Sequence, residues 1–186
     1  MKKTPTVKKV FENPIFRDKV TVVKTSEETN GSYSLAELEL NPGGGNPLHS
    51  HSAFTETFLS VKGKLGVRIN NEKFELAPGQ SKTVPLNTNH HFFNPTDQTI
   101  TFQIKFEPGH DNFIKGLAIG YGLAGDKLTN KKGIPKSFTN LALIIELTDT
   151  RPAGILGALF PVFRWLAFRA KKNGAEEKLL DRYYYE

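Results

Sequence analysis

Hydrophobic and polar residues alternate with a period of two in many segments between residues 20 and 107. The alternation is strictest in 99–106, where every even position is isoleucine or phenylalanine and the odd positions carry threonine, glutamine or lysine. Such a pattern indicates a β-strand with one face in a hydrophobic core. About eight such segments without an intervening helix predict an antiparallel sandwich or barrel. The predicted strands cover residues 20–25, 33–40, 54–61, 65–69, 73–76, 81–85, 90–94 and 98–107.

The pattern changes after Pro108-Gly109. Residues 112–128 look helical although they are rich in glycine, and Ser137 is a plausible N-cap for a helix that runs through Leu147. We therefore predict a mainly β fold with a C-terminal α-helical extension. The expected division is a flexible basic arm over 1–14, a β-barrel over 15–109, and a helical extension over 110–186 that packs on the barrel or on a dimer partner.

Residues 153–168 form the most apolar part of the extension. Arg164 is the single charged residue among them, and basic residues follow at 169, 171 and 172. The stretch is short for a membrane span and Pro161 interrupts it. Peripheral membrane contact through residues 153–172 is one reading. Packing of this helix against the protein or a partner is the reading that we prefer.

Composition narrows the class of protein. Hydrophobic residues make up 38% of the 186 positions, cysteine is absent, and the formal net charge is +6. The absence of cysteine excludes disulfides, thiolate metal ligands and cysteine nucleophiles. Basic residues occur as dispersed pairs rather than as a stripe with aromatics, so we expect no nucleic-acid binding. Residues 1–20 lack the apolar core of a signal peptide, and we expect a cytoplasmic protein.

Histidines and one glutamate recur beside turn residues. His49 and His51 are two apart, so in a strand both side chains point to the same side. Glu56 lies on the next predicted strand, and His90 lies on a later one. Three imidazoles and a carboxylate suit one divalent transition metal ion such as Fe, Mn, Ni, Co, Cu or Zn, rather than Ca or Mg. Because His91 faces away from His90, we expect His91, like His110, to be an ordinary histidine.

The spacing of these residues resembles that of the cupins. One cupin motif is G-x5-H-x-H-x(3,4)-E-x6-G, and the second is G-x5-P-x-G-x2-H-x3-N. Asn87 stands in place of the second motif's inner glycine, and asparagine tolerates left-handed backbone torsions better than most residues. The resemblance covers roughly residues 30–107. The other motif positions are filled by Gly43, His49, His51, Glu56, Gly63, Gly79, Pro85, His90 and Asn94.

The resemblance implies a jelly-roll β-barrel (a double-stranded β-helix) that holds one metal ion through His49, His51, Glu56 and His90. It also implies a homodimer and a small-molecule ligand or substrate. We expect Asn94 to be a structural hydrogen-bonding residue. A dioxygenase-like enzyme is the first hypothesis, with an isomerase or cyclase as its variant, and a non-catalytic binding or sensing module is the alternative.

No catalytic residue is identified beyond the metal ligands. Tyr33 or Glu37 could act as a general base, but nothing in the sequence selects either residue. Phenylalanines are numerous, and we expect most of them to fill the core of the barrel, because barrel interiors require large apolar side chains. The candidate substrate-pocket residues are Phe54, Phe58, Phe92 and Phe102.

Overall fold

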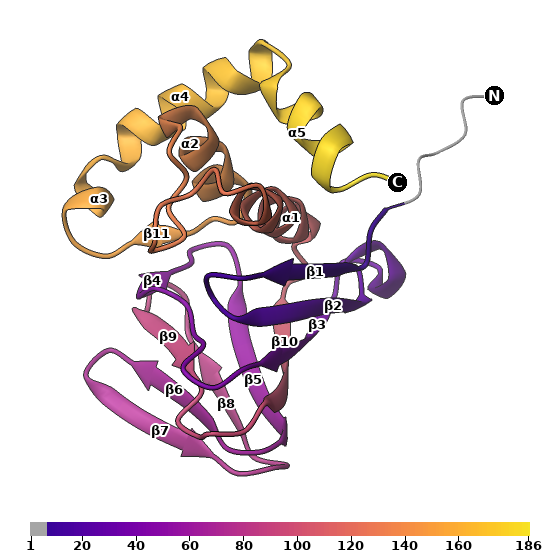
Figure 1. The fold of residues 1–186 in the computed structure, drawn as a ribbon, viewed down its shortest axis with the longest axis vertical. Coiled ribbons are helices and arrows are strands. Elements are labelled where there is room, and N and C mark those ends of the chain that lie inside the picture. Colours follow the sequence, from indigo (N-terminus) through magenta and orange to yellow (C-terminus); the bar gives the residue numbers. More distant parts are fainter. Residues whose placement is uncertain (1–6) are drawn as a thin grey trace.

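The computed structural model describes residues 7–186, and all the strands of its two sheets pair antiparallel (Figure 1). One sheet has six strands in the order β1-β2-β3-β10-β5-β8, and the other has five in the order β11-β4-β9-β6-β7. The first sheet contains β1 (Val10–Asn13), β2 (Asp18–Lys24), β3 (Ser34–Leu40), β5 (Thr55–Lys62), β8 (Ser81–Val84) and β10 (Ile100–Glu107). The second contains β4 (His49–Ser50), β6 (Leu65–Ile69), β7 (Glu72–Leu76), β9 (His90–Phe93) and β11 (Arg151–Pro152).

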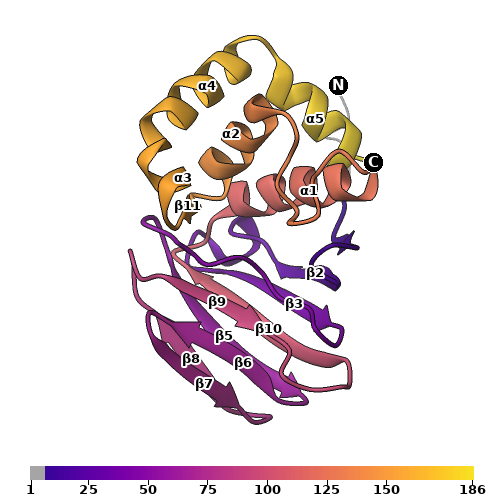
Figure 2. The ribbon, with the colours of Figure 1, turned by 60° about the vertical axis from the view of Figure 1, so that its left-hand side comes forward.

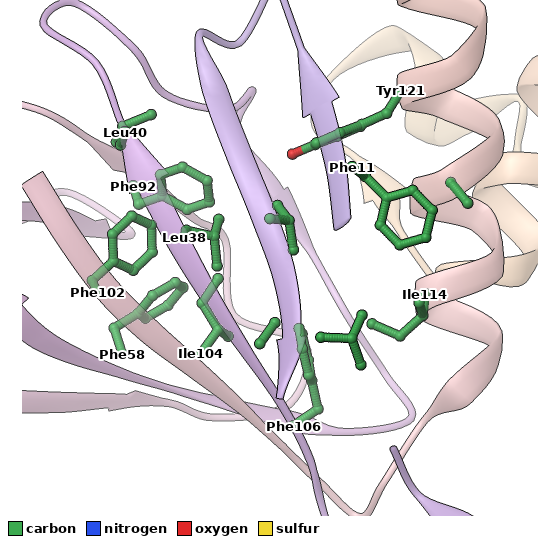
Figure 3. Close-up of a cluster of buried hydrophobic side chains, with 14 of the residues drawn as sticks. Phe11, Leu38, Leu40, Phe58, Phe92, Phe102, Ile104, Phe106, Ile114 and Tyr121 are labelled. Atoms are coloured by element: carbon green, nitrogen blue, oxygen red, sulfur yellow. The ribbon is translucent and has the colours of Figure 1, made fainter. Parts of the chain in front are cut away.

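The predicted alternation is confirmed in the central strand of the larger sheet. Every even position of β10 from Ile100 to Phe106 is buried, and the odd positions are only partly buried. β10 pairs with β3 on one side and β5 on the other, so residues far apart in sequence meet in this core. Figure 3 shows Phe58, Phe92 and Phe102 gathered together in this core. The mainly β fold is therefore observed, and closure of the two sheets into a barrel stays a prediction.

Helices cover one end of the strands (Figure 2). A short 3-10 helix, η1 (Glu27–Thr29), lies between β2 and β3. Ser137 accepts a hydrogen bond from Asn140 N (3.4 Å) and is the N-cap of α2, as predicted. α1 packs on β1 and α2, and α4 packs on α2 and α5. The helices are α1 (Asp111–Gly125), α2 (Phe138–Leu147), α3 (Ile155–Ala158), α4 (Phe160–Lys172) and α5 (Ala175–Tyr183).

Glycines lower the helix propensity of α1, but one of them permits close packing against α2. A Cβ added at Gly116 would lie 2.5 Å from Thr148 Cγ2 and 3.1 Å from Leu147 Cβ. The missing side chain therefore lets the end of α2 approach α1 closely. Tertiary packing outweighs the lower helix propensity of glycine, which costs about 1 kcal/mol relative to alanine.

The N-terminal segment differs from the predicted arm where the structure describes it. Val10–Asn13 form β1, which pairs with β2, and the side chain of Phe11 is buried against Ile114 of α1 (Figure 3). Lys8 N donates a hydrogen bond to Tyr184 O (2.9 Å) near the C-terminus. A four-residue strand is too short to show a clear period, so the alternation did not reveal it. Residues 1–6 of the predicted arm lie outside the described residues.

Candidate metal centre and cavity

Four buried side chains meet between the two sheets. His49 comes from β4, His51 follows directly after it, Glu56 is on β5 and His90 is on β9. Their ligand atoms all lie within 4.8 Å of one another. His49 and His90 are paired across β4 and β9, which explains how residues about forty positions apart reach the same point. The structure thus brings together all four residues that the sequence proposed as ligands.

Backbone carbonyls orient the three imidazoles. The Nδ1 atoms of His49 and His90 lie 2.7 Å from Pro47 O and 2.8 Å from Thr88 O, respectively. Nδ1 of His51 lies 3.2 Å from Asp149 O. Because a carbonyl oxygen only accepts hydrogen bonds, each Nδ1 carries the proton and each Nε2 is the atom available for a metal ion.

The Nε2 atoms of the cluster do not all have hydrogen-bond partners within the protein. His90 Nε2 lies 2.7 Å from Glu56 Oε2, whereas His51 Nε2 lies 3.7 Å from Glu56 Oε1. Within the described residues, His51 Nε2 is buried without a hydrogen-bond partner. A buried nitrogen without a partner is costly, and a metal ion among these atoms would satisfy it.

Burial and mutual charge determine the protonation of the cluster. Burial, together with the neighbouring His51 and His90, lowers the pKa of His49 to about 3, and burial also lowers the pKa of His51. Burial would raise the pKa of Glu56, but attraction to His51 and the hydrogen bond from His90 outweigh it and lower the pKa to about 2. His90 differs, because burial lowers its pKa but the hydrogen bond and attraction to Glu56 outweigh burial and raise it. Neutral imidazoles and an ionised carboxylate are the forms that ligate metal ions, so a metal ion would displace the proton that His90 Nε2 shares with Glu56.

The helical extension holds the ligand loop in place. The Asp149 carboxylate, just after α2, accepts hydrogen bonds from Ala53 N (2.7 Å) and from the backbone N–H and hydroxyl of Ser52. Arg151 Nη2 donates to Ser52 Oγ (3.1 Å), and β11 pairs with β4 directly beside His49. Sequence reasoning missed Asp149, since nothing in its local sequence connects it to a loop nearly one hundred positions earlier.

A cavity of about 330 Å³ lies beside the cluster. His49 and Glu56 form part of its wall, together with strand residues such as Leu38 and Ile104. The opposite wall comes from α1, α2 and the loop between them, including Leu117, Ile144 and Ile134. The extension therefore completes a chamber that the strands leave open at one end.

The predicted substrate-pocket residues are distributed differently around this chamber. Phe92 lines the cavity, whereas Phe58 and Phe102 are completely buried in the core and are not part of its wall. Phe54 stacks on the His51 ring at 4.5 Å between ring centroids. The prediction omitted the helical wall, because helix periodicity does not show which end of the sheets a helix covers.

Other candidate residues lie outside the cluster. His91 is half-buried, and His110 precedes α1 with its ring 5.0 Å from that of Phe54. Asn94 Nδ2 donates to Leu40 O (2.9 Å) and Gln98 O (2.7 Å), as expected of a structural residue. Asn87 has a φ of 57°, so it adopts the left-handed torsion that the motif's glycine would supply. Tyr33 and Glu37, the two residues considered as a general base, do not line the cavity.

Residues 36–104 match the sequence model of the family described as the Cupin domain. No curated protein matches the chain. Similar solved structures include KdgF from Halomonas sp., with 18% identity, coverage of 55% of this chain and 90% of that chain, and a TM-score of 0.49.

Two further solved structures show comparable similarity. An RmlC-like cupin from Shewanella frigidimarina has 16% identity, with coverage of 61% of this chain and 92% of that chain and a TM-score of 0.47. The polyketide cyclase RemF from Streptomyces resistomycificus has 20% identity, with coverage of 57% and 79% and a TM-score of 0.46. At these TM-scores, none of the three similarities bears on the chemistry of this chain.

Proposed function

The chain is a cupin-superfamily protein, and we propose that it binds one divalent transition metal ion and a small, largely apolar organic molecule beside it. The observation that carries the proposal is the position of the His/Glu cluster at the wall of the cavity. Both His49 and Glu56 face the chamber, so a molecule inside it would lie next to the metal position.

The donor set fits a transition metal ion. Three imidazole nitrogens and one carboxylate oxygen suit Fe, Mn, Ni, Co, Cu or Zn better than Ca or Mg, which prefer oxygen ligands. When bound, the ion would supply a Lewis acid with open coordination positions for oxygen-containing groups. His49, His51 and His90 would hold it through Nε2, because backbone carbonyls occupy each Nδ1.

The cavity wall selects an apolar ligand. Most of the wall is aliphatic or aromatic, and most of its polar side chains are already hydrogen-bonded within the protein. The Tyr121 hydroxyl donates to Asp18 Oδ2 (2.6 Å), Asn46 Oδ1 accepts from Phe92 N (2.9 Å), and Thr148 Oγ1 donates to Ile144 O (2.7 Å). These hydrogen bonds leave few polar atoms of the wall available to recognise a polar ligand. The exposed Lys132 is the wall's cationic group, and it favours a ligand with an anionic or oxygen-rich outer end.

A dioxygenase-like reaction is the activity that we propose. Among the described residues of the cavity wall, the only acids or bases beyond the ligands are Lys132 and Tyr121, and the Tyr121 hydroxyl is already bound to Asp18. Isomerisation or cyclisation requires proton transfer by positioned groups, whereas oxygen insertion into an electron-rich ligand depends more on the metal itself. The ligand that meets these conditions has an apolar body and an enol- or phenol-like oxygen directed at His49 and Glu56.

The alternative is a binding or sensing module without turnover. The same scarcity of acid and base groups in the wall favours this alternative, because a chamber that only binds a ligand does not need them. The homodimer and the cytoplasmic location stay predictions.

Metal analysis of the purified protein tests the proposal first. Protein purified without a metal-affinity tag is compared with His49→Ala/His51→Ala and with His91→Ala, whose ring lies outside the cluster. We expect about one transition metal ion per chain in the wild type and in His91→Ala, and none in the double variant. Absence of metal from all three proteins, even after incubation with each candidate ion, would refute the metal site.

Ligand assays then separate the two functions. Metal-loaded protein is exposed to a panel of phenolic and enolic compounds, and oxygen uptake is followed beside thermal stabilisation. Oxygen uptake that is absent in the double variant supports a dioxygenase. Thermal stabilisation by a compound that is recovered unchanged supports the binding module.

A further inference from the structure

Helix α4 has two apolar faces, and the protein covers one of them. Phe163, Ala167 and Ala170 are buried and pack against residues of α2 such as Leu143. On the opposite side lies an outer stripe formed by Val162, Trp165 and Phe168, which are 51%, 56% and 65% exposed. The spacing of three residues places the outer stripe on one side of the helix. Two exposed aromatic residues in such a stripe indicate an interaction surface.

Basic side chains surround the outer stripe. α4 contains no acidic residue, and its charged residues are Arg164, Arg169, Lys171 and Lys172, all exposed. The Arg169 guanidinium lies over the Trp165 ring at 5.1 Å from its centroid. Only Lys171 has a carboxylate near it, Glu176 Oε2 at 3.7 Å, among the described residues. The surface therefore combines an apolar centre with a positive border.

We propose that the outer stripe of α4 docks onto a membrane surface that contains anionic headgroups, with the helix lying in the interface plane. Tryptophan and phenylalanine would enter the headgroup region while the arginines and lysines contact lipid phosphates. A second copy of this chain fits the surface less well, because it would bring together two sets of positive charges.

The position of α4 in the fold permits such contact. α2 lies between α4 and α1, so α4 forms the outer layer on the side away from the strands (Figure 2). α4 contains 13 residues, a length of about 20 Å, which is less than the hydrocarbon core of a bilayer. Within the described residues, no helix has the length and apolar character needed to cross a membrane. Docking in the plane is therefore the geometry that the helix allows.

Trp165 is the only tryptophan in the sequence, so its fluorescence reports directly on the outer stripe. The full chain is titrated at low salt with vesicles of equimolar phosphatidylglycerol and phosphatidylcholine, and separately with phosphatidylcholine alone. We expect a blue shift with the anionic vesicles that high salt reverses, and little change with the neutral vesicles. No shift with anionic vesicles would overturn the proposal. A blue shift that grows with protein concentration without lipid would also overturn it, in favour of a second copy.

Two paired substitutions provide the matched comparison. Val162→Ser/Phe168→Ser changes the outer stripe and retains the fluorescent Trp165. Val61→Ser/Leu86→Ser removes side chains of 44% and 45% exposure from the strand region. Both variants change exposed residues, and thermal unfolding verifies that they are folded. We expect co-sedimentation with anionic vesicles to weaken about tenfold or more for the stripe variant and to stay unchanged for the control. Wild-type binding by the stripe variant, or an equal loss in both variants, would refute the proposal.

Discussion

The strands and the helical extension contribute different parts of the same site. The strands and their loops supply His49, His51, Glu56 and His90, whereas the extension supplies one wall of the cavity and the Asp149 carboxylate that holds the ligand loop. The ligands can be recognised by spacing along the chain, but the cavity wall exists only once the helices are docked. The comparison teaches that the strands position the proposed metal ligands, whereas the extension shapes the cavity in which the proposed small molecule would lie.

Removal of the proposed metal ion tests the ligands that the strands and their loops supply. It has the largest expected effect on stability. An ion that binds only the folded protein at a free concentration of 1,000 times its Kd stabilises it by about 4 kcal/mol. We therefore expect a chelator to lower the free energy of unfolding by about this amount, measured by denaturant titration with and without added metal. The double variant His49→Ala/His51→Ala should be insensitive to the chelator. Equal chelator sensitivity of both proteins would place the ion elsewhere.

The strands and the proposed metal ligands could be predicted because their signals lie in short stretches of sequence. His49 and His51 are separated by one residue, Gly63 and Gly79 occupy positions that require positive φ, and β10 repeats apolar residues with strict alternation. The helices α1 and α2 were predicted for similar reasons. Their docking was not predictable, because it depends on contacts such as that of Gly116 with Thr148, whose residues are far apart in sequence.

The pair of Asp18 and Tyr121 links the two halves and makes stability depend on pH. Asp18 on β2 accepts a hydrogen bond from the Tyr121 hydroxyl of α1, and its Oδ1 is buried without a partner among the described residues. Burial, opposed in part by that hydrogen bond, raises the pKa of Asp18 from 3.8 to about 6. The folded protein therefore holds this proton more tightly than the unfolded chain does.

The sign of the effect follows from this linkage. Between about pH 4 and pH 6 the folded state binds more protons than the unfolded state, so the stability contributed by Asp18 falls as the pH rises. The pKa shift corresponds to a decrease of about 3 kcal/mol in the free energy of unfolding across this pH range. Asp18→Asn should remove this pH dependence. The difference in unfolding free energy between wild type and variant should therefore change by about 3 kcal/mol from pH 4 to pH 7. A constant difference would show that Asp18 has an ordinary pKa in the folded protein.

Asp149→Asn tests how strongly the extension supports the metal centre. The residue has a φ of 47°, which asparagine tolerates, so the substitution removes the charge with little backbone strain. Hydrogen bonds to a charged group contribute about 1.5–3 kcal/mol, and we expect a loss of about 2 kcal/mol in stability. Loss of such a supporting residue typically reduces metal affinity by about 10- to 100-fold. Competition with a chromophoric chelator measures the affinity, with the exposed Asp97→Asn as control. Unchanged affinity would show that the metal centre does not depend on the extension.

Two glycines on the same face of α1 provide the smallest and sharpest test of the helical half. Both Gly116 and Gly120 line the cavity, but a Cβ at Gly120 would be only in ordinary contact, 3.7 Å from Ile144 Cδ1. Gly120→Ala should therefore stabilise the protein by about 0.5–1 kcal/mol through helix propensity. Gly116→Ala should destabilise it, because its Cβ would meet Thr148 Cγ2 at 2.5 Å and force α2 away from α1. Thermal unfolding of both variants measures the contrast. Equal shifts of the same sign would show that α1 and α2 do not pack as closely as the structure has them, and the chamber would then lose its helical wall.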